Sequence, residues 1–256
     1  MTGTMGAAPV ADDTTEDLRR LVDRTRHVVF DFDGPICFLY PGRSAKRIAA
    51  AWAEWLRERG TDGLDEPDGP DGLLAEAERD HQDPYSLLSA VAGRHPGSDL
   101  LAELEERLTR QELAQVPRAW PTPHADVLVR TWVALGVRTA IATDTSDRPV
   151  LSYLAGRGLT SCFAPHVHGR AQDLRLLTPH PHTLHRALHS LGAAPETTLV
   201  IGGTPAGFAA AREAGTEFLG YAPSERSEQR LLAAGVARGH LVSSLDVLLK
   251  VVREGA

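Results

Sequence analysis

Two aspartates spaced two residues apart follow an apolar run at positions 28–35 (VVFDFDGP). Residues i and i+2 of an extended strand point to the same side, so Asp31 and Asp33 should lie together. Adjacent carboxylates repel each other, and their usual uses are as a nucleophile with a general acid/base or as metal ligands. The pair therefore predicts a catalytic or metal-binding site at the carboxyl end of a buried strand, where open α/β sheets bind their ligands.

The composition restricts the class of protein. The chain has 256 residues, of which 42% are hydrophobic and 24% are charged, as in ordinary globular proteins. Its net charge of −7 argues against nucleic acid and anionic membranes as partners. No apolar run approaches the roughly 20 residues of a membrane helix, and two cysteines cannot form a disulfide framework. We therefore expect a cytoplasmic protein that binds neither nucleic acid nor membrane, while the sequence leaves its oligomeric state open.

The elements that must position the aspartates alternate between helix and strand. A helix is expected at 16–24 and a strand at 27–32, and the alternation resumes after Pro117. The later strands are expected at 138–143, 163–168, 198–202, 217–221 and near Leu241, with helices at 123–135, 148–158, 179–191, 205–214, 225–234 and 243–252. Such alternation predicts an α/β fold with a doubly wound parallel sheet.

The segment between the first strand and this alternation has a different pattern. Helical periodicity is seen at 44–60, 73–80, 85–94 and 98–116, with an acidic, turn-rich loop at 61–72. We therefore predict a helical cap domain at 37–116 inserted into a core domain formed by 16–36 and 117–256. Residues 1–15 are small and polar, and we expect them to form a disordered leader.

The order of these motifs resembles the haloacid dehalogenase superfamily, whose commonest members are magnesium-dependent phosphatases. The first strand of that family ends in Asp-x-Asp-Gly, which Asp31 and Asp33 match, and the second ends in Ser or Thr, which Thr143 matches. The resemblance covers about 27–252 and implies a Rossmann-like core with an inserted all-helical cap. It also implies that Asp31 forms an aspartyl-phosphate, that Asp33 is the general acid/base, and that Thr143, with Asp144 beside it, binds phosphate.

Three positions depart from the family pattern. The family has a lysine before Pro-x-Pro, whereas this chain has Thr178 before Pro179-His180-Pro181. Both acids of the family's Gly-Asp-x-x-x-Asp loop are replaced, by Gly203 and Gly207. Loss of one preorganised electrostatic group costs about a hundred- to a thousandfold in rate. Because Mg²⁺ prefers several carboxylates plus substrate phosphate, we expect Asp31 and Asp33 to bind it only weakly.

Two functions follow from this mixture. In the first, the protein is a hydrolase of small phosphorylated metabolites with impaired activity. In the second, it is a catalytically inactive binding or partner module on the same fold. Other charges could replace those that are missing, although each is also explained as a solvated surface group: Arg43, Lys46, Asp144, Asp147, Arg170, Asp173 and Arg175.

Other chemically capable residues have simpler explanations. His182, His185 and His189 share one helix face, which could bind a metal but more simply faces solvent. Cys37 could be a reactive thiol, although a packed small residue is the simpler prediction. Trp120, in the return from the cap, could line a pocket.

Overall fold

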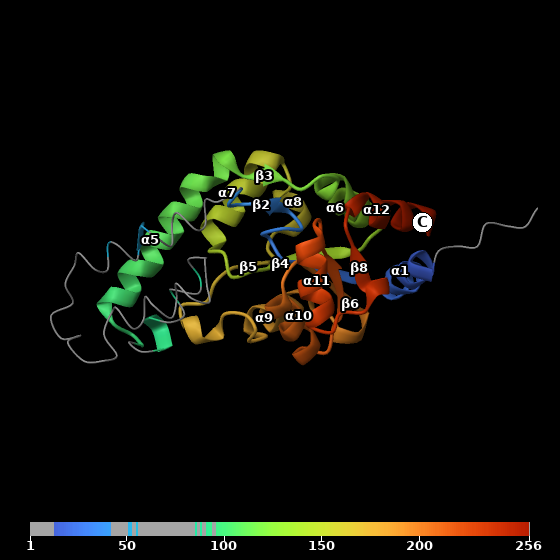
Figure 1. The fold of residues 1–256 in the computed structure, drawn as a ribbon. Coiled ribbons are helices and arrows are strands. Elements are labelled where there is room, and N and C mark those ends of the chain that lie inside the picture. The colour runs from blue at the N-terminus through green and yellow to red at the C-terminus, as the bar shows by residue number, and fades with distance from the viewer. Residues whose placement is uncertain are drawn as a thin grey trace, which may run out of the picture.

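The computed structural model describes residues 13–41, 51, 52, 55, 85, 88, 91–93 and 96–255. Their centre is a six-stranded parallel sheet in the spatial order β5-β4-β1-β6-β7-β8 (Figure 1). The strands are β1 (His27–Phe30), β4 (Arg138–Ala142), β5 (Val167–His168), β6 (Thr198–Gly202), β7 (Glu217–Tyr221) and β8 (Leu241–Val242). β1 lies between β4 and β6, with Phe30 in register with Ile141 and Ile201. The predicted doubly wound sheet is confirmed.

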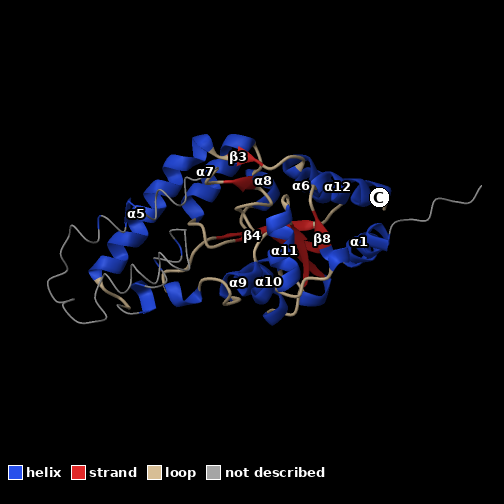
Figure 2. Ribbon diagram, in the orientation of Figure 1, coloured by secondary structure: helices blue, strands red, loops and turns tan. Residues whose placement is uncertain are grey.

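Helices cover both faces of this sheet, as Figure 2 shows. They are α1 (Asp13–Arg24), α5 (Asp99–Gln115), α6 (Ala125–Ala134), α7 (Asp147–Arg157), α8 (Thr160–Phe163), α9 (His182–Leu191), α10 (Pro205–Glu213), α11 (Glu225–Ala233) and α12 (Leu245–Glu254). Short 3-10 turns lie at Val116–Arg118, Leu174–Leu176, Pro195–Thr197 and Arg238–His240. None of the helices in the described part of the chain is both long and apolar enough to cross a membrane.

The two faces have separate apolar cores. On one face, Phe30 packs among side chains of α1, α6, α7 and α12, and its ring meets those of Trp132 and Phe163 edge-on at 5.9 Å. On the other face, Val29 packs against α9, α10 and α11. Because both faces are covered, β1 and β6 are nearly continuous apolar runs. The sheet is therefore a rigid base for the residues that follow its strands.

A short antiparallel ribbon joins the two ends of the predicted cap. β2 (Cys37–Phe38) pairs with β3 (Trp120–Pro121), a pairing that the sequence analysis does not predict. Beyond the ribbon, α5 extends away from the sheet on the side opposite α1 (Figure 1). Residues 51, 52, 55, 85, 88 and 91–93 are helical, as expected for a cap, and the rest of the predicted helices before 96 lie outside the described residues. The domain boundaries remain a prediction.

Most predicted elements differ from the structure by one to three residues at their ends, and three differences change the interpretation. β1 ends at Phe30, so Asp31 and Asp33 follow the strand rather than end it. Phe163 belongs to the short helix α8, and only Val167–His168 pair with β4. α1 begins at Asp13, inside the predicted leader, while residues 1–12 lie outside the described part of the chain.

Candidate functional site

Asp31 and Thr143 meet at the carboxyl ends of β1 and β4. The Thr143 hydroxyl donates to Asp31 Oδ1 at 2.9 Å, and the backbone amide of Phe32 donates to the same oxygen at 2.7 Å. Asp33 lies in the following turn, where its Oδ1 accepts the amide of Leu39 at 3.0 Å. Gly34 has φ of 106°, a conformation that suits glycine, so the residue after Asp33 permits this turn. The structure thus brings together the two aspartates and the threonine of the predicted site.

The electrostatics of this pair are unfavourable for ionisation. Burial and, to a smaller extent, the nearby charge of Asp33 together raise the pKa of Asp31 to about 7, against the hydrogen bond from Thr143. Burial likewise raises the pKa of Asp33 to about 6, opposed by the hydrogen bond from Leu39. Each carboxyl therefore holds a proton at a pH where an exposed aspartate would not.

Thr178 takes the place of the family's lysine and contacts Asp144 instead of supplying a charge. Its amide donates to Asp144 Oδ1 at 3.1 Å, and its hydroxyl donates to Oδ2 at 2.5 Å. The Asp144 carboxylate is thereby directed to the loop before Pro179. A role for Asp144 in phosphate binding remains a prediction.

The end of β6 lies beside Asp31 but contributes no carboxylate. A Cβ on Gly202 would lie 4.0 Å from the Cβ of Asp31, so the chain approaches the site closely here. Gly203 and Gly207 follow, where the family carries acids. Within the described residues no group of three or more His, Cys, Asp or Glu side chains could hold a metal ion. The residues present therefore do not fit the Mg²⁺ that the family generally uses.

Arg170, one of the predicted replacement cations, is fully buried and already paired. Its Nη1 donates to Glu112 at 2.9 Å and to the carbonyl oxygen of Asp144 at 2.8 Å. Its Nη2 and Nε donate to Glu105, and both glutamates lie on helix α5. Burial alone would lower the pKa of Arg170, but Glu112 raises it above the ordinary value, so the guanidinium stays charged. The carboxylates of Glu105 and Glu112 neutralise the Arg170 guanidinium, so this side chain is not available to bind a phosphate.

Glu112 and Tyr85 complete this buried network, and the sequence analysis did not select either. The Tyr85 hydroxyl donates to Glu112 Oε1 at 2.9 Å and lies 3.1 Å from the Thr145 hydroxyl. The amide of Ser146 donates to Glu112 Oε2 at 3.2 Å. A signal for Glu112 exists, because it extends the series of buried residues Leu104 and Leu108 at four-residue spacing on α5. We call Tyr85, Glu112 and Arg170 the cap–core network.

Among the described residues, the replacement charges Arg175, Asp173 and Asp147 form no contact with the two aspartates. Arg175 forms an ion pair with Asp173 at 2.7 Å, and both side chains are exposed. Asp147 is exposed on the first turn of α7. Arg43 and Lys46 lie outside the described residues.

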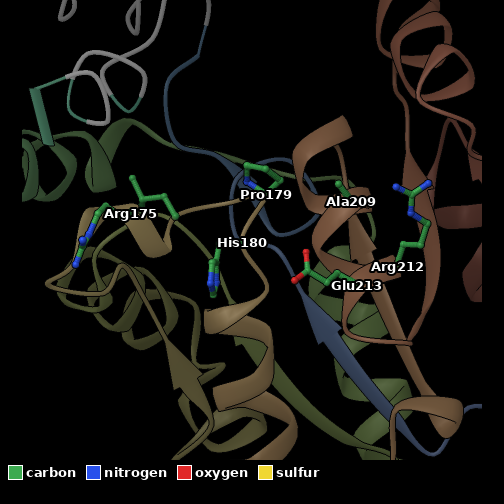
Figure 3. Close-up of a pocket in the computed structure, with 7 residues that line it drawn as sticks. Arg175, Pro179, His180, Ala209, Arg212 and Glu213 are labelled. Atoms are coloured by element: carbon green, nitrogen blue, oxygen red, sulfur yellow. The ribbon is translucent and has the colours of Figure 1, made fainter. Parts of the chain in front are cut away.

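A surface groove of about 650 Å³ flanks the loop that carries Thr178 (Figure 3). Its walls come from that loop and from α10, and they are Arg175, Leu177, Pro179, His180, Ala209, Arg212 and Glu213. Figure 3 shows the Glu213 carboxylate turned towards His180, with Arg175 and Arg212 at opposite ends. Arg212 lies over the ring of Phe208 at 6.0 Å. The groove is therefore distinct from the Asp31 site and brings no cation to it.

The remaining candidates lie outside the Asp31 site. Cys37 is fully buried, and burial raises the pKa of its thiol, which disfavours the reactive thiolate. His185 and His189 are exposed on α9, as predicted for a solvent-facing face. Trp120 is 63% exposed on β3 and lines none of the groove described above.

Comparisons with known proteins agree with the fold and identify a family. A family model described as haloacid dehalogenase-like hydrolase matches residues 25–215. A predicted phosphatase from Clostridium acetobutylicum has a similar structure, with a TM-score of 0.63 and 17% identity over 90% of this chain and 99% of that one. A HAD family hydrolase from Deinococcus radiodurans R1, solved with bound phosphate and sodium, has a TM-score of 0.56 and 26% identity over 91% and 96%. CbbY from Rhodobacter sphaeroides, solved with xylulose-(1,5)bisphosphate, has a TM-score of 0.60 and 20% identity over 86% and 94%. No curated protein matches the sequence.

Proposed function

Because the chain belongs to the haloacid dehalogenase-like hydrolase family, we propose that it hydrolyses phosphate monoesters of small molecules slowly, through a phosphoryl group carried on Asp31. The observation that supports the proposal is the contact of Thr143 with Asp31 at 2.9 Å, with Asp33 in the adjoining turn. In this proposal Asp31 is the nucleophile, Thr143 supplies the phosphate-binding hydroxyl and Asp33 is the proton donor. The solved structures with phosphate and with a sugar bisphosphate support the substrate class by analogy.

The proposed reaction has two steps, and residues of this chain carry out both. In the first, a carboxylate oxygen of Asp31 attacks phosphorus as the bond to the leaving oxygen breaks, and Asp33 gives that oxygen its proton. In the second, Asp33 takes a proton from water, whose oxygen attacks phosphorus and releases Asp31. The Thr143 hydroxyl can turn from Asp31 to a phosphoryl oxygen.

The protonation states explain why this reaction should be slow. Asp31 must be ionised, with a pKa of about 7, while Asp33 must be protonated, with a pKa of about 6. If the two sites titrated independently, only about one molecule in twenty would carry both states at the best pH. The phosphoryl group would also approach without the positive charge that normally stabilises its transition state.

The missing charges provide the test. We expect wild-type protein to turn over p-nitrophenyl phosphate with Mg²⁺ only slowly, and Asp31→Asn to abolish that turnover. The triple variant Thr178→Lys/Gly203→Asp/Gly207→Asp should raise it by about tenfold or more, because it returns a cation and two metal-ligand acids. A Cβ at Gly203 would lie 3.4 Å from the Tyr221 carbonyl oxygen, whereas a Cβ at Gly207 would lie 3.2 Å from the Thr204 hydroxyl oxygen, which must shift by a few tenths of an ångström to admit it.

A matched control separates charge from bulk. Thr178→Met/Gly203→Asn/Gly207→Asn has side chains of similar size without the charges and should show no gain. If the folded, charged triple variant is no more active than this control, the missing charges are not what limits the rate. If wild-type turnover is absent as well, the protein is better explained as a binding module without catalysis, whose three missing charges are the expected sign of lost activity.

A further inference from the structure

The residue after Asp33 is held by hydrogen bonds on both of its peptide groups. The amide of Gly34 donates to the carbonyl oxygen of Cys37 at 2.7 Å, and the carbonyl oxygen of Gly34 accepts the hydroxyl of Thr122. Glycine has the greatest backbone freedom, so these two bonds limit the directions in which the chain leaves Asp33. Because Pro35 has no N–H, the Gly34–Pro35 peptide group can be held only through the oxygen that Thr122 binds.

Thr122 ties this turn to the apolar core. It directly follows β3, is 3% exposed, and donates its amide to the carbonyl oxygen of Ile36 at 3.1 Å. Its own carbonyl oxygen accepts the amide of Ala125, the first residue of α6, at 3.1 Å. Ala125 and Trp132 of α6 are buried in the core that also encloses Phe30. The turn is therefore anchored to a packed helix through one threonine.

The far end of the turn holds the carboxyl group itself. The amide of Leu39, which follows β2, donates to Asp33 Oδ1 at 3.0 Å. This bond fixes one carboxyl oxygen, while the bonds at Gly34 fix the main chain from which the Asp33 side chain leaves. Loss of the Thr122 hydroxyl would free that main chain and weaken the bond from Leu39.

Asp31 is held by contacts that do not involve this turn. Its Oδ1 accepts the Thr143 hydroxyl and the Phe32 amide, and its own amide donates to the carbonyl oxygen of Ile201 on β6 at 2.9 Å. A change at Thr122 should therefore displace the acid and leave the nucleophile in place.

We propose that Thr122 is a positioning residue, whose hydroxyl holds the turn at Gly34 so that Asp33 faces the oxygen that leaves phosphorus. The inference rests on the proposed function and adds to it a residue from the segment that returns from the predicted cap. A general acid contributes about a hundred- to ten-thousandfold to the rate, provided that it lies within hydrogen-bond reach of the oxygen. A partly displaced Asp33 should lose part of that factor, and only for leaving groups that need a proton.

Two esters that differ in the basicity of the leaving oxygen test the proposal. Phenol, with a pKa of about 10 like the tyrosine side chain, is a poor leaving group without a proton, whereas p-nitrophenol is more acidic and leaves readily as the anion. The ratio kcat/KM reports the steps up to the aspartyl-phosphate, in which Asp33 is the proton donor. We expect Thr122→Val to lower kcat/KM for phenyl phosphate by about tenfold and for p-nitrophenyl phosphate by at most about twofold. Thr122→Ser keeps the hydroxyl and should retain the wild-type values.

Hydrogen exchange, measured by NMR without substrate, tests the positioning separately from turnover. The amide of Leu39 should exchange about five- to tenfold faster in Thr122→Val than in wild type, because its bond to Asp33 is weakened. The amide of Phe32, which donates to Asp31, should exchange at nearly the wild-type rate. Thr122→Ser should keep the wild-type rate at both amides.

Thr139→Val is the matched control, since Thr139 is also buried and its hydroxyl also donates to a carbonyl oxygen, that of Cys162. It should change neither the exchange of Leu39 nor the ratio of kcat/KM for the two esters. Equal losses for both esters in Thr122→Val, or unchanged exchange of Leu39, would overturn the inference. The proposed function fails separately, if wild-type turnover is absent or survives Asp31→Asn, and the exchange of Leu39 then still decides whether Thr122 holds the turn.

Discussion

The protonation of Asp31 should make the protein less stable as the pH rises. The pKa of the Asp31 carboxyl is about 7 in the folded protein, whereas the ordinary value, expected in the unfolded chain, is 3.8. Between these pH values the folded protein therefore binds more protons than the unfolded chain. Stability then falls with rising pH, because the unfolded chain ionises first. The loss begins near pH 4 and is complete above pH 7. Asp31→Asn removes this titration and should therefore remove this loss.

The magnitude follows from the size of the shift. Each pH unit between the two pKa values is worth about 1.4 kcal/mol. Two of those pH units, from pH 5 to the pKa of about 7, fall between pH 5 and pH 8. Wild-type protein should therefore lose about 3 kcal/mol of unfolding free energy over this range, and Asp31→Asn should not. The amide keeps an oxygen for the hydrogen bonds from Thr143 and Phe32, so the fold at this position is retained.

Urea denaturation at pH 5 and pH 8 measures the difference directly. Asp147→Asn, on the exposed first turn of α7, is the control for the substitution itself and should follow wild type at both pH values. Parallel loss of stability in wild type and Asp31→Asn would refute the reasoning, since it would mean that the Asp31 carboxyl is ionised in the folded protein without appreciable cost.

Three further outcomes are expected. The pH–rate profile of wild-type turnover should be bell-shaped with its maximum near pH 6.5, between the pKa values of about 6 and about 7 for the two aspartates, and a maximum above pH 8 would contradict this. Arg170→Met should cost about 3–5 kcal/mol of unfolding free energy because it leaves Glu112 buried without its cation, and Arg170→Met/Glu112→Leu should recover most of that loss; equal losses in both variants would count against a buried ion pair. Iodoacetamide should alkylate the partly exposed Cys162 in native protein and spare Cys37 until urea unfolds the chain, as mass spectrometry of tryptic peptides would show; rapid labelling of Cys37 would mean that it is accessible.

The sheet could be predicted from the sequence because its central strands β1 and β6 are nearly continuous apolar runs and strands alternate with helices along the chain. β6 and β7 have the predicted bounds, at 198–202 and 217–221. The strand predicted at 163–168 is confirmed only at Val167–His168, and Phe163 was predicted wrongly because a short apolar run does not distinguish a strand from a single helical turn. The pairing of β2 with β3 was missed because two-residue strands have no periodicity to detect.

Part of the candidate site could likewise be predicted from the sequence, and part could not. Asp31, Asp33 and Thr143 could be selected because each follows a strand, and parallel strands end at one edge. The fate of Arg170 could not be predicted, since its partner Glu112 lies 58 residues away in the sequence and the pairing depends on how α5 packs.

The β2–β3 ribbon fixes where the inserted segment joins the core. Its two connections run side by side through Cys37–Phe38 and Trp120–Pro121, and the Thr122 hydroxyl donates to the carbonyl oxygen of Gly34. The ion pair between Glu112, on α5, and Arg170, which follows β5, is a second link between the two parts of the chain. Substitution of Arg170 therefore removes one of these links while it leaves the ribbon, the nucleophile and its acid unchanged.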